Sequence, residues 1–246
     1  VGDDSSGNLI REGLSRDGVV PLLHEERGCS TGECAILVDL LSRDRTISCF
    51  RGAGGVITPS SIEQFAQWWK PDGHSPETER TLFTTGFVVT TDLRFETVLA
   101  LEREHDVFSL SLASPALLED SHPARSRIES LLPRTDLLLG TAEEALALAG
   151  KAAGGDPERA VKAVVERLKP NAVFVVTDGP RDAIFARHDG RDPEKVPVAG
   201  HVPENEIVDT NGAGDAFAGG FLASWLTGDR SRESIRTSVQ AGHECA

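Results

Sequence analysis

The chain has 246 residues, of which 39% are hydrophobic, as expected for a globular protein. Its net charge of −14 argues against a nucleic-acid partner, because duplex affinity is carried largely by Lys and Arg side chains on phosphates. No window holds the roughly eighteen consecutive apolar residues that a membrane span needs, so no membrane association is expected.

The first third of the chain predicts a helix over 7–18 and two strands over 33–41 and 46–50. The polar turn between the strands indicates a β-hairpin, which resembles a small lid or flap within about residues 19–57. A further helix is predicted over 58–69.

From about residue 80, apolar runs and amphipathic stretches alternate. The predicted strands are 81–89, 106–112, 136–140 and 171–177, and the predicted helices are 93–104, 142–150 and 158–168. This order implies an α/β fold, with a doubly wound, mostly parallel sheet flanked by helices. The polar loop 186–206 leaves room for short edge strands. No segment reads as a linker between independent domains, so residues 1–246 are expected to form one domain.

The cysteines do not suggest a disulfide scaffold. No C-x-x-C pair occurs among the four cysteines, which are Cys29, Cys34, Cys49 and Cys245. Reduced thiols and a cytoplasmic location are therefore expected. The seven histidines lack zinc-ligand spacing, and no zinc site is expected. The start, VGDDSSGN, has neither a basic patch nor an apolar run, so no signal peptide is expected.

The stretch DTNGAGDAFAGGFLASWLTG, residues 209–228, carries the strongest chemical signal. Phe217, Phe221 and Trp225 recur at i, i+4 and i+8, which predicts a helix. Residues 212–214 would then form the turn that enters this helix. Unpaired N–H groups at such a turn, together with the helix dipole, form an anion site.

Asp215 distinguishes this turn from two common phosphate loops. A Walker loop needs a lysine here, and a dinucleotide fingerprint needs glycine where Phe217 stands. A carboxylate beside an anion site is suited to accept a proton from a hydroxyl that attacks the bound phosphate. Two alternatives stay open: Asp215 as an ordinary dipole complement worth about 0.3–1 kcal/mol, and Asp209, which is better placed to orient the loop.

The segment DTNGAGDAFAGGFL resembles the C-terminal signature of the PfkB (ribokinase-like) carbohydrate kinases, and its Asn211 form resembles the adenosine kinases among them. The same family resemblance extends to VGDDSSG, STGECA, RDRTI, GFVVT and IRTSVQAGH. It implies a ribokinase-like kinase with a small β lid, acting as a monomer. The implied reaction is ATP-dependent phosphorylation of the adenosine 5′-hydroxyl to AMP with Mg²⁺, so the expected partners are a small nucleoside and ATP.

The resemblance assigns site residues by position. Asp215 matches the catalytic base, and the anion hole matches Gly212, Ala213 and Gly214. The ATP-binding positions match Thr177, Gly179 and Asn211. Arg45 matches a lid arginine near the phosphates, with a solvated turn charge as the alternative. Phe87 matches an aromatic that stacks on the purine, with core packing as the alternative.

Glu144 matches the acid that supports the metal and its waters. The family has N-x-x-E at this point, whereas this chain has Thr141 in place of the asparagine. Thr141 and Glu144 also fit a capping box, so a structural role is the alternative.

Family members begin upstream of VGDDSSG and continue beyond AGHECA, so the resemblance implies an incomplete kinase domain. Two other functions stay open: a ribokinase- or fructokinase-type sugar kinase, and a catalytically silent remnant.

Overall fold

The computed structural model describes residues 1–39, 45–56, 58–64, 79–198, 200, 202, 207 and 210–246. The chain divides into two compact units, Val1–Thr78 and Glu79–Ala246. Three features of the sequence analysis lie outside the described residues. They are residues 42–44 of the predicted turn, residues 65–69 of the predicted helix, and Asp209.

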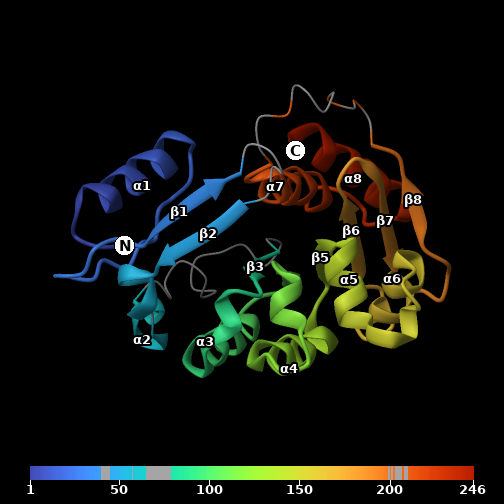
Figure 1. Ribbon diagram of the computed structural model, residues 1–246, viewed down its shortest axis with the longest axis horizontal. Coiled ribbons are helices and arrows are strands. Elements are labelled where there is room, and N and C mark those ends of the chain that lie inside the picture. The colour runs from blue at the N-terminus through green and yellow to red at the C-terminus, as the bar shows by residue number, and fades with distance from the viewer. Residues whose placement is uncertain are drawn as a thin grey trace. The chain divides into compact units, whose positions relative to one another are not determined.

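The first unit contains α1 (Ser5–Arg16), the antiparallel pair β1 (Glu33–Val38) and β2 (Arg45–Phe50), and α2 (Pro59–Glu63) (Figure 1). β1 and β2 form a sheet of their own in the described part of the chain. The hairpin therefore exists where the two apolar runs predicted it, and α2 begins at the predicted helix start, where Thr58 forms a capping box with Ser61.

The element VGDDSSG organises the start of this unit. The Asp4 carboxylate accepts hydrogen bonds from the Gly7 N–H at 2.8 Å, the Thr31 N–H at 2.7 Å and the Thr31 hydroxyl at 2.6 Å. These bonds lower the pKa of Asp4 to about 2, and the bond from the Thr31 hydroxyl has the largest effect. A Cβ on Gly2 would lie 2.3 Å from the Cys29 carbonyl oxygen, so only glycine allows this close approach.

The second unit is built on one sheet, which has six strands among the described residues, in the order β3-β4-β5-β6-β7-β8. The first four strands pair in parallel; β7 then pairs antiparallel with β6, and β8 pairs antiparallel with β7. Their bounds are β3 Thr81–Thr85, β4 Val107–Ser111, β5 Leu137–Thr141, β6 Val173–Asp178, β7 Arg181–Arg187 and β8 Glu194–Val196.

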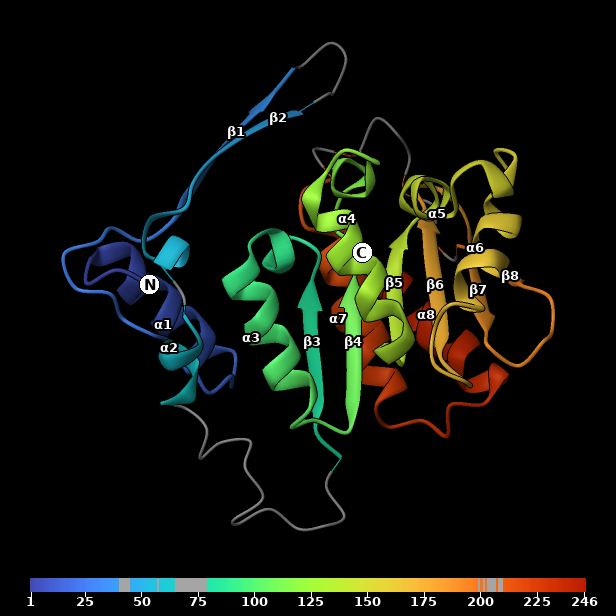
Figure 2. The same cartoon turned by 90° about the horizontal axis from the view of Figure 1, so that it is seen from below.

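Helices cover both faces of this sheet (Figures 1 and 2). One face packs against α3 (Asp92–Glu102), α4 (Pro123–Leu131), α5 (Ala142–Ala149) and α6 (Pro157–Val165). The other face packs against α7 (Ala213–Trp225) and α8 (Arg232–Cys245). Alternate strand residues separate into the two cores, with Leu138 and Phe174 on the α3–α6 side and Leu137 and Val173 on the α7–α8 side. The predicted doubly wound α/β fold is confirmed.

One strand differs from its prediction, and two elements of the structure were not predicted. The strand expected over 81–89 ends at Thr85, because Gly86 turns the chain against β4, where a Cβ would lie 2.5 Å from the Leu112 carbonyl oxygen. Helix α4 was not predicted from the sequence. Strand β7 was also missed; it follows β6 after a turn in which Gly179 has φ of 56°. β8 lies in the loop 186–206, where short edge strands were allowed.

The cysteine prediction is wrong for one pair. The β1–β2 register places Cys34 directly opposite Cys49, and a disulfide joins them. Cys29 and Cys245 are free thiols. Sequence spacing could not reveal the pair, because it arises from strand register. No described helix combines the length and apolarity that crossing a lipid bilayer requires.

Candidate active site

Two candidate residues, Thr177 and Glu144, lie at the edge of the sheet where β5 and β6 end. The parallel ladder pairs Thr141 with Thr177, and the Thr177 hydroxyl donates to the Gly140 carbonyl at 3.5 Å. Thr177 is only partly buried, so its side chain reaches the solvent side of the strand ends. In open α/β sheets, ligands bind outside the carboxyl ends of the parallel strands.

Glu144 lies one helical turn beyond the end of β5. Its Oε2 accepts the Thr141 N–H at 2.8 Å, and its own N–H donates to the Thr141 hydroxyl at 3.2 Å. The capping role is therefore present. The residue is 5% exposed, and burial raises the pKa of its carboxyl although the Thr141 bonds oppose the rise.

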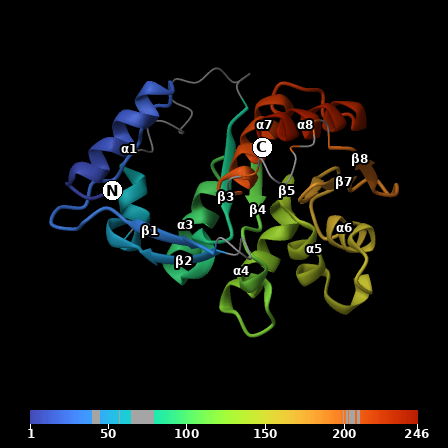
Figure 3. The ribbon, with the colours of Figure 1, turned by 45° about the horizontal axis from the view of Figure 1, so that its top comes forward.

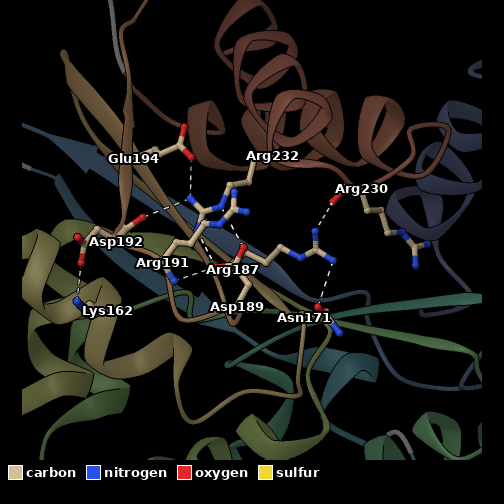
Figure 4. A network of polar contacts seen from close by, with 9 residues as sticks. All are labelled: Lys162, Asn171, Arg187, Asp189, Arg191, Asp192, Glu194, Arg230 and Arg232. Atoms are coloured by element: carbon tan, nitrogen blue, oxygen red, sulfur yellow. Dashed lines mark hydrogen bonds and ion pairs between the residues drawn. The ribbon is translucent and has the colours of Figure 1, made fainter.

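Contacts of Arg230, which follows the C-terminal end of α7, show at which edge of the sheet this helix ends. Arg230 lies over the Trp225 ring at 4.4 Å and forms an ion pair with Glu79, just before β3. The Arg187 guanidinium donates to the Arg230 carbonyl at 3.4 Å (Figure 4), and Arg187 is paired with Val173, the first residue of β6. The C-terminal end of α7 thus lies at the amino edge of the parallel strands.

The beginning of α7 lies at the opposite edge. A 13-residue helix is about 20 Å long, similar to a strand of five or six residues. In its second turn, the Phe217 ring is 5.4 Å from the His243 ring, and Asp182 at the start of β7 acts electrostatically on His243. Asp182 follows the turn that leaves the carboxyl end of β6. Residues 212–215 are therefore directed to the edge that carries Thr177 and Glu144.

The turn itself has the features of an anion site. Gly212 is the N-cap with φ of 79°, and no side chain of the described residues caps the helix. The first N–H groups of an α-helix have no partner within the helix. The Ala213 N–H donates to the Thr210 carbonyl at 3.3 Å, whereas the Gly212 and Gly214 N–H groups have no partner among the described residues and are available to an anion. Asp215 stands in this first turn with an exposed side chain, which forms no hydrogen bond or ion pair with the described residues.

The remaining predicted residues have different positions. Phe87 follows β3 and is 55% exposed, so the core-packing alternative for its ring is wrong. Gly179 lies in the β6–β7 turn, and Asn211 precedes Gly212 with an exposed side chain. Arg45 begins β2 in the first unit, whereas the other site residues belong to the second unit.

His243 is a polar residue that sequence analysis did not single out. Its Nδ1 is buried without a hydrogen-bond partner among the described residues, and burial lowers the pKa of its ring while Asp182 opposes the shift. The signal available in the sequence was its place on the helix after the signature.

The described residues offer few metal-ligating side chains at this edge of the sheet. In the described part of the chain, no three His, Cys, Asp or Glu side chains are grouped to hold a metal. Glu144 supplies one buried carboxylate, which is bonded to Thr141, the register partner of Thr177. This arrangement fits a hydrated Mg²⁺ that keeps most of its waters and takes other oxygens from substrate phosphates.

The fold is a doubly wound α/β sheet with a helix N-terminus directed to its carboxyl edge, an arrangement that suits an anionic ligand. Residues 1–246 match the family described as pfkB family carbohydrate kinase, and the chain belongs to that family.

Individual relatives are longer than this chain. An adenosine kinase of Schizophyllum commune is 29% identical over 260 residues, which span 100% of this chain and 70% of the relative. One of Schizosaccharomyces pombe is 27% identical over 100% of this chain and 71% of the relative. The crystal structure of Anopheles gambiae adenosine kinase in complex with P1,P4-di(adenosine-5) tetraphosphate has a TM-score of 0.81 at 25% identity, covering 100% of this chain and 70% of that one.

Proposed function

We propose that the protein is a nucleoside kinase of the adenosine kinase type, which transfers the γ-phosphoryl group of ATP to the 5′-hydroxyl of adenosine. The products are AMP and ADP. One observation carries this proposal: an exposed carboxylate, Asp215, stands in the uncapped first turn of a helix that is directed to the carboxyl edge of the sheet. The relatives named adenosine kinase support the acceptor.

In the proposed reaction, the Asp215 carboxylate accepts the proton of the attacking hydroxyl. The oxygen of that hydroxyl forms a bond to the γ-phosphorus, and the bond from that phosphorus to the β,γ-bridging oxygen breaks. The N–H groups of Gly212 and Gly214 stabilise the charge on the transferring phosphoryl group, and that of Ala213 joins them once it leaves the Thr210 carbonyl. No side-chain acceptor caps α7 among the described residues, so no cap competes with the phosphate for these N–H donors.

The other proposed residues bind and orient the substrates. Thr177, Gly179 and Asn211 would hold ATP near the ends of the strands, and Phe87 presents an exposed ring for stacking on a purine. Glu144 would hold Mg²⁺ through its waters; the ion, when bound, neutralises charge on the phosphates. The β1–β2 hairpin would act as the lid and carry Arg45 to the phosphates.

Two other functions are distinguished by specific observations. The family description, carbohydrate kinase, favours a sugar as the acceptor. Thr141 in place of the family asparagine favours a catalytically silent protein, because the Thr141–Glu144 capping box gives both residues a structural role.

The deciding experiment offers adenosine, ribose and fructose in turn to the purified chain with ATP and Mg²⁺, and quantifies ADP and the phosphorylated product. AMP formed from adenosine supports the proposal, whereas activity on a sugar alone overturns it. Thermal unfolding with and without ATP and Mg²⁺ measures binding independently of phosphate transfer, since a ligand that binds the folded state raises the melting temperature. A chain that transfers no phosphate but binds ATP would be the silent protein.

A further inference from the structure

The hairpin of the first unit carries two cysteines on one rung of its ladder. Cys34 and Cys49 are register partners with Cα atoms 4.2 Å apart, and their sulfurs are bonded. The neighbouring rung on the same side of the hairpin pairs Ile36 with Ile47. The disulfide is therefore a cross-strand link within the ladder, and it fixes the relative register of β1 and β2.

This link acts on a hairpin that has little other support. All residues of β1, and the described side chains of β2, are exposed, and the two strands form a separate sheet in the described part of the chain. An isolated two-stranded hairpin is marginally stable in water. A covalent bond between the strands therefore contributes much of the resistance to opening, because it limits the open conformations of the segment between residues 34 and 49.

The same exposure makes the link accessible to small thiols and disulfides. Exposed disulfides are more easily exchanged than buried structural ones. The free cysteines differ in setting: Cys29 is partly buried, and Cys245 lies at the end of α8 in the other unit. Neither belongs to the hairpin ladder, so the Cys34–Cys49 pair stands apart as a candidate for reversible oxidation.

We propose that the Cys34–Cys49 pair is a redox clasp, which holds the β1–β2 hairpin closed when oxidised and releases it when reduced. The oxidant is a low-molecular-weight disulfide such as oxidised glutathione, and the corresponding thiol, reduced glutathione, is the reductant that reverses the two steps below. One cysteine thiolate attacks a sulfur of that disulfide and displaces a glutathione thiolate, which gives a mixed disulfide. The second cysteine thiolate then attacks the protein sulfur of the mixed disulfide and displaces the second glutathione.

The clasp has a consequence for the proposed kinase. β2 begins at Arg45, which pairs with Val38 at the far end of the ladder from the Glu33–Phe50 rung. Opening the ladder therefore alters the segment proposed to reach the phosphates. This consequence rests on the proposed function, whereas the clasp itself does not.

The experiment uses the whole chain as wild type, as C34S/C49S, and as C29S/C245S, which removes the free thiols and serves as the matched control. After equilibration with oxidised glutathione, C29S/C245S should present no free thiol and carry no bound glutathione, and after reduction it should present two free thiols. Peptide mass spectrometry should identify the Cys34–Cys49 link. Reduction should accelerate tryptic cleavage after Arg45 and Arg51 on the order of tenfold, because cleavage follows the population of the open form.

The two variants should respond in opposite ways. C29S/C245S should keep the full redox effect on cleavage, and C34S/C49S should be cleaved rapidly in either state. If C29S/C245S retains two titratable thiols in oxidised glutathione, or if the link forms without slowing cleavage, the clasp is wrong. Should C34S/C49S fail to fold, the comparison of oxidised and reduced wild type still decides. Loss of phosphotransfer alone would contradict the proposed function and leave these thiol and cleavage results unaffected.

Discussion

Gly220 of α7 lies against the backbone of Ala241 of α8, so closely that a Cβ on Gly220 would be 2.6 Å from the Ala241 carbonyl oxygen. The same Cβ would be 2.7 Å from the Cys245 sulfur. The two helices therefore pack through their main chains at this point, as their adjacent paths in Figure 3 illustrate. This contact helps to fix the helix whose first turn carries Asp215.

The neighbouring glycine provides a matched control for this contact. A Cβ on Gly219 would meet no atom within 4 Å. We expect Gly219→Ala to raise the free energy of unfolding by about 0.5–1 kcal/mol, since alanine is the better helix former. Gly220→Ala should lower it by about 1–3 kcal/mol, because the methyl group forces the helices apart. Urea denaturation of both variants measures the difference, and equal effects of the same sign would contradict the close packing.

Asp215→Asn should reduce kcat for phosphotransfer by about 10²–10⁴-fold, the usual contribution of a positioned general base. The fold should remain, because the side chain is exposed and without a partner among the described residues. Glu233→Gln is the matched control, since Glu233 is also an exposed acid in the first turn of a helix. Steady-state kinetics of both variants test the assignment; it fails if the two variants retain similar kcat values.

The buried carboxyl of Glu144 should make stability depend on pH. Its pKa is raised in the folded state, mainly by burial, so the folded protein holds this proton more tightly than the unfolded chain does. The contribution of Glu144 to stability is therefore present below its ordinary value of 4.5 and is lost as pH rises through the higher folded pKa.

Glu144→Gln tests this dependence, because glutamine can still accept the Thr141 N–H but cannot ionise. The free energy of unfolding of the variant, relative to wild type, should increase between pH 4 and pH 7. The exposed neighbour Glu143 supplies the control, and Glu143→Gln should show little of this effect. A pH-independent difference for Glu144→Gln would contradict burial as the cause of the pKa shift.

Arg232 connects the start of α8 to the chain around β7 and β8 (Figure 4). Its guanidinium donates to the Asp189 carboxylate at 3.1 and 2.8 Å and to Glu194 at 2.6 Å. We expect Arg232→Ala to lower the free energy of unfolding by roughly 1–3 kcal/mol, because charge-assisted bonds in a largely buried setting are lost. Arg159→Ala should have almost no effect, since Arg159 is 74% exposed and has one ion pair, at 3.4 Å.

The same network predicts an acid dependence. Hydrogen bonds from Arg232 are the main cause that lowers the pKa of Asp189 from 3.8 to about 2. The resulting stabilisation is present above the ordinary value and is lost as pH falls through the folded value. Acid titration followed by circular dichroism should show this loss in wild type and a weaker one in Arg232→Ala. Identical titration curves would exclude Arg232 as the cause.

Local signals in the sequence were sufficient to predict the central strands and the helix α7. Apolar runs predicted β4, β5 and β6 to within one or two residues at most ends, because strands buried on both faces are continuously apolar. The i, i+4, i+8 aromatics of α7 predicted the helix, and Phe217, Phe221 and Trp225 all lie in its buried face. The turn at Gly212, with its left-handed φ, was likewise readable from small residues before a helical period.

Other features follow from contacts between distant segments. β7 was missed because its partner strand β6 supplies the antiparallel pairing, and the disulfide was missed because strand register brings Cys34 to Cys49. The sequence by itself determined the class of fold, the helix that begins at Ala213 and the acid in its first turn. Only the tertiary structure decided that this turn is directed to the strand ends bearing Thr177 and Glu144, because that depends on anchors such as Arg187 and Arg230, which no local pattern encodes.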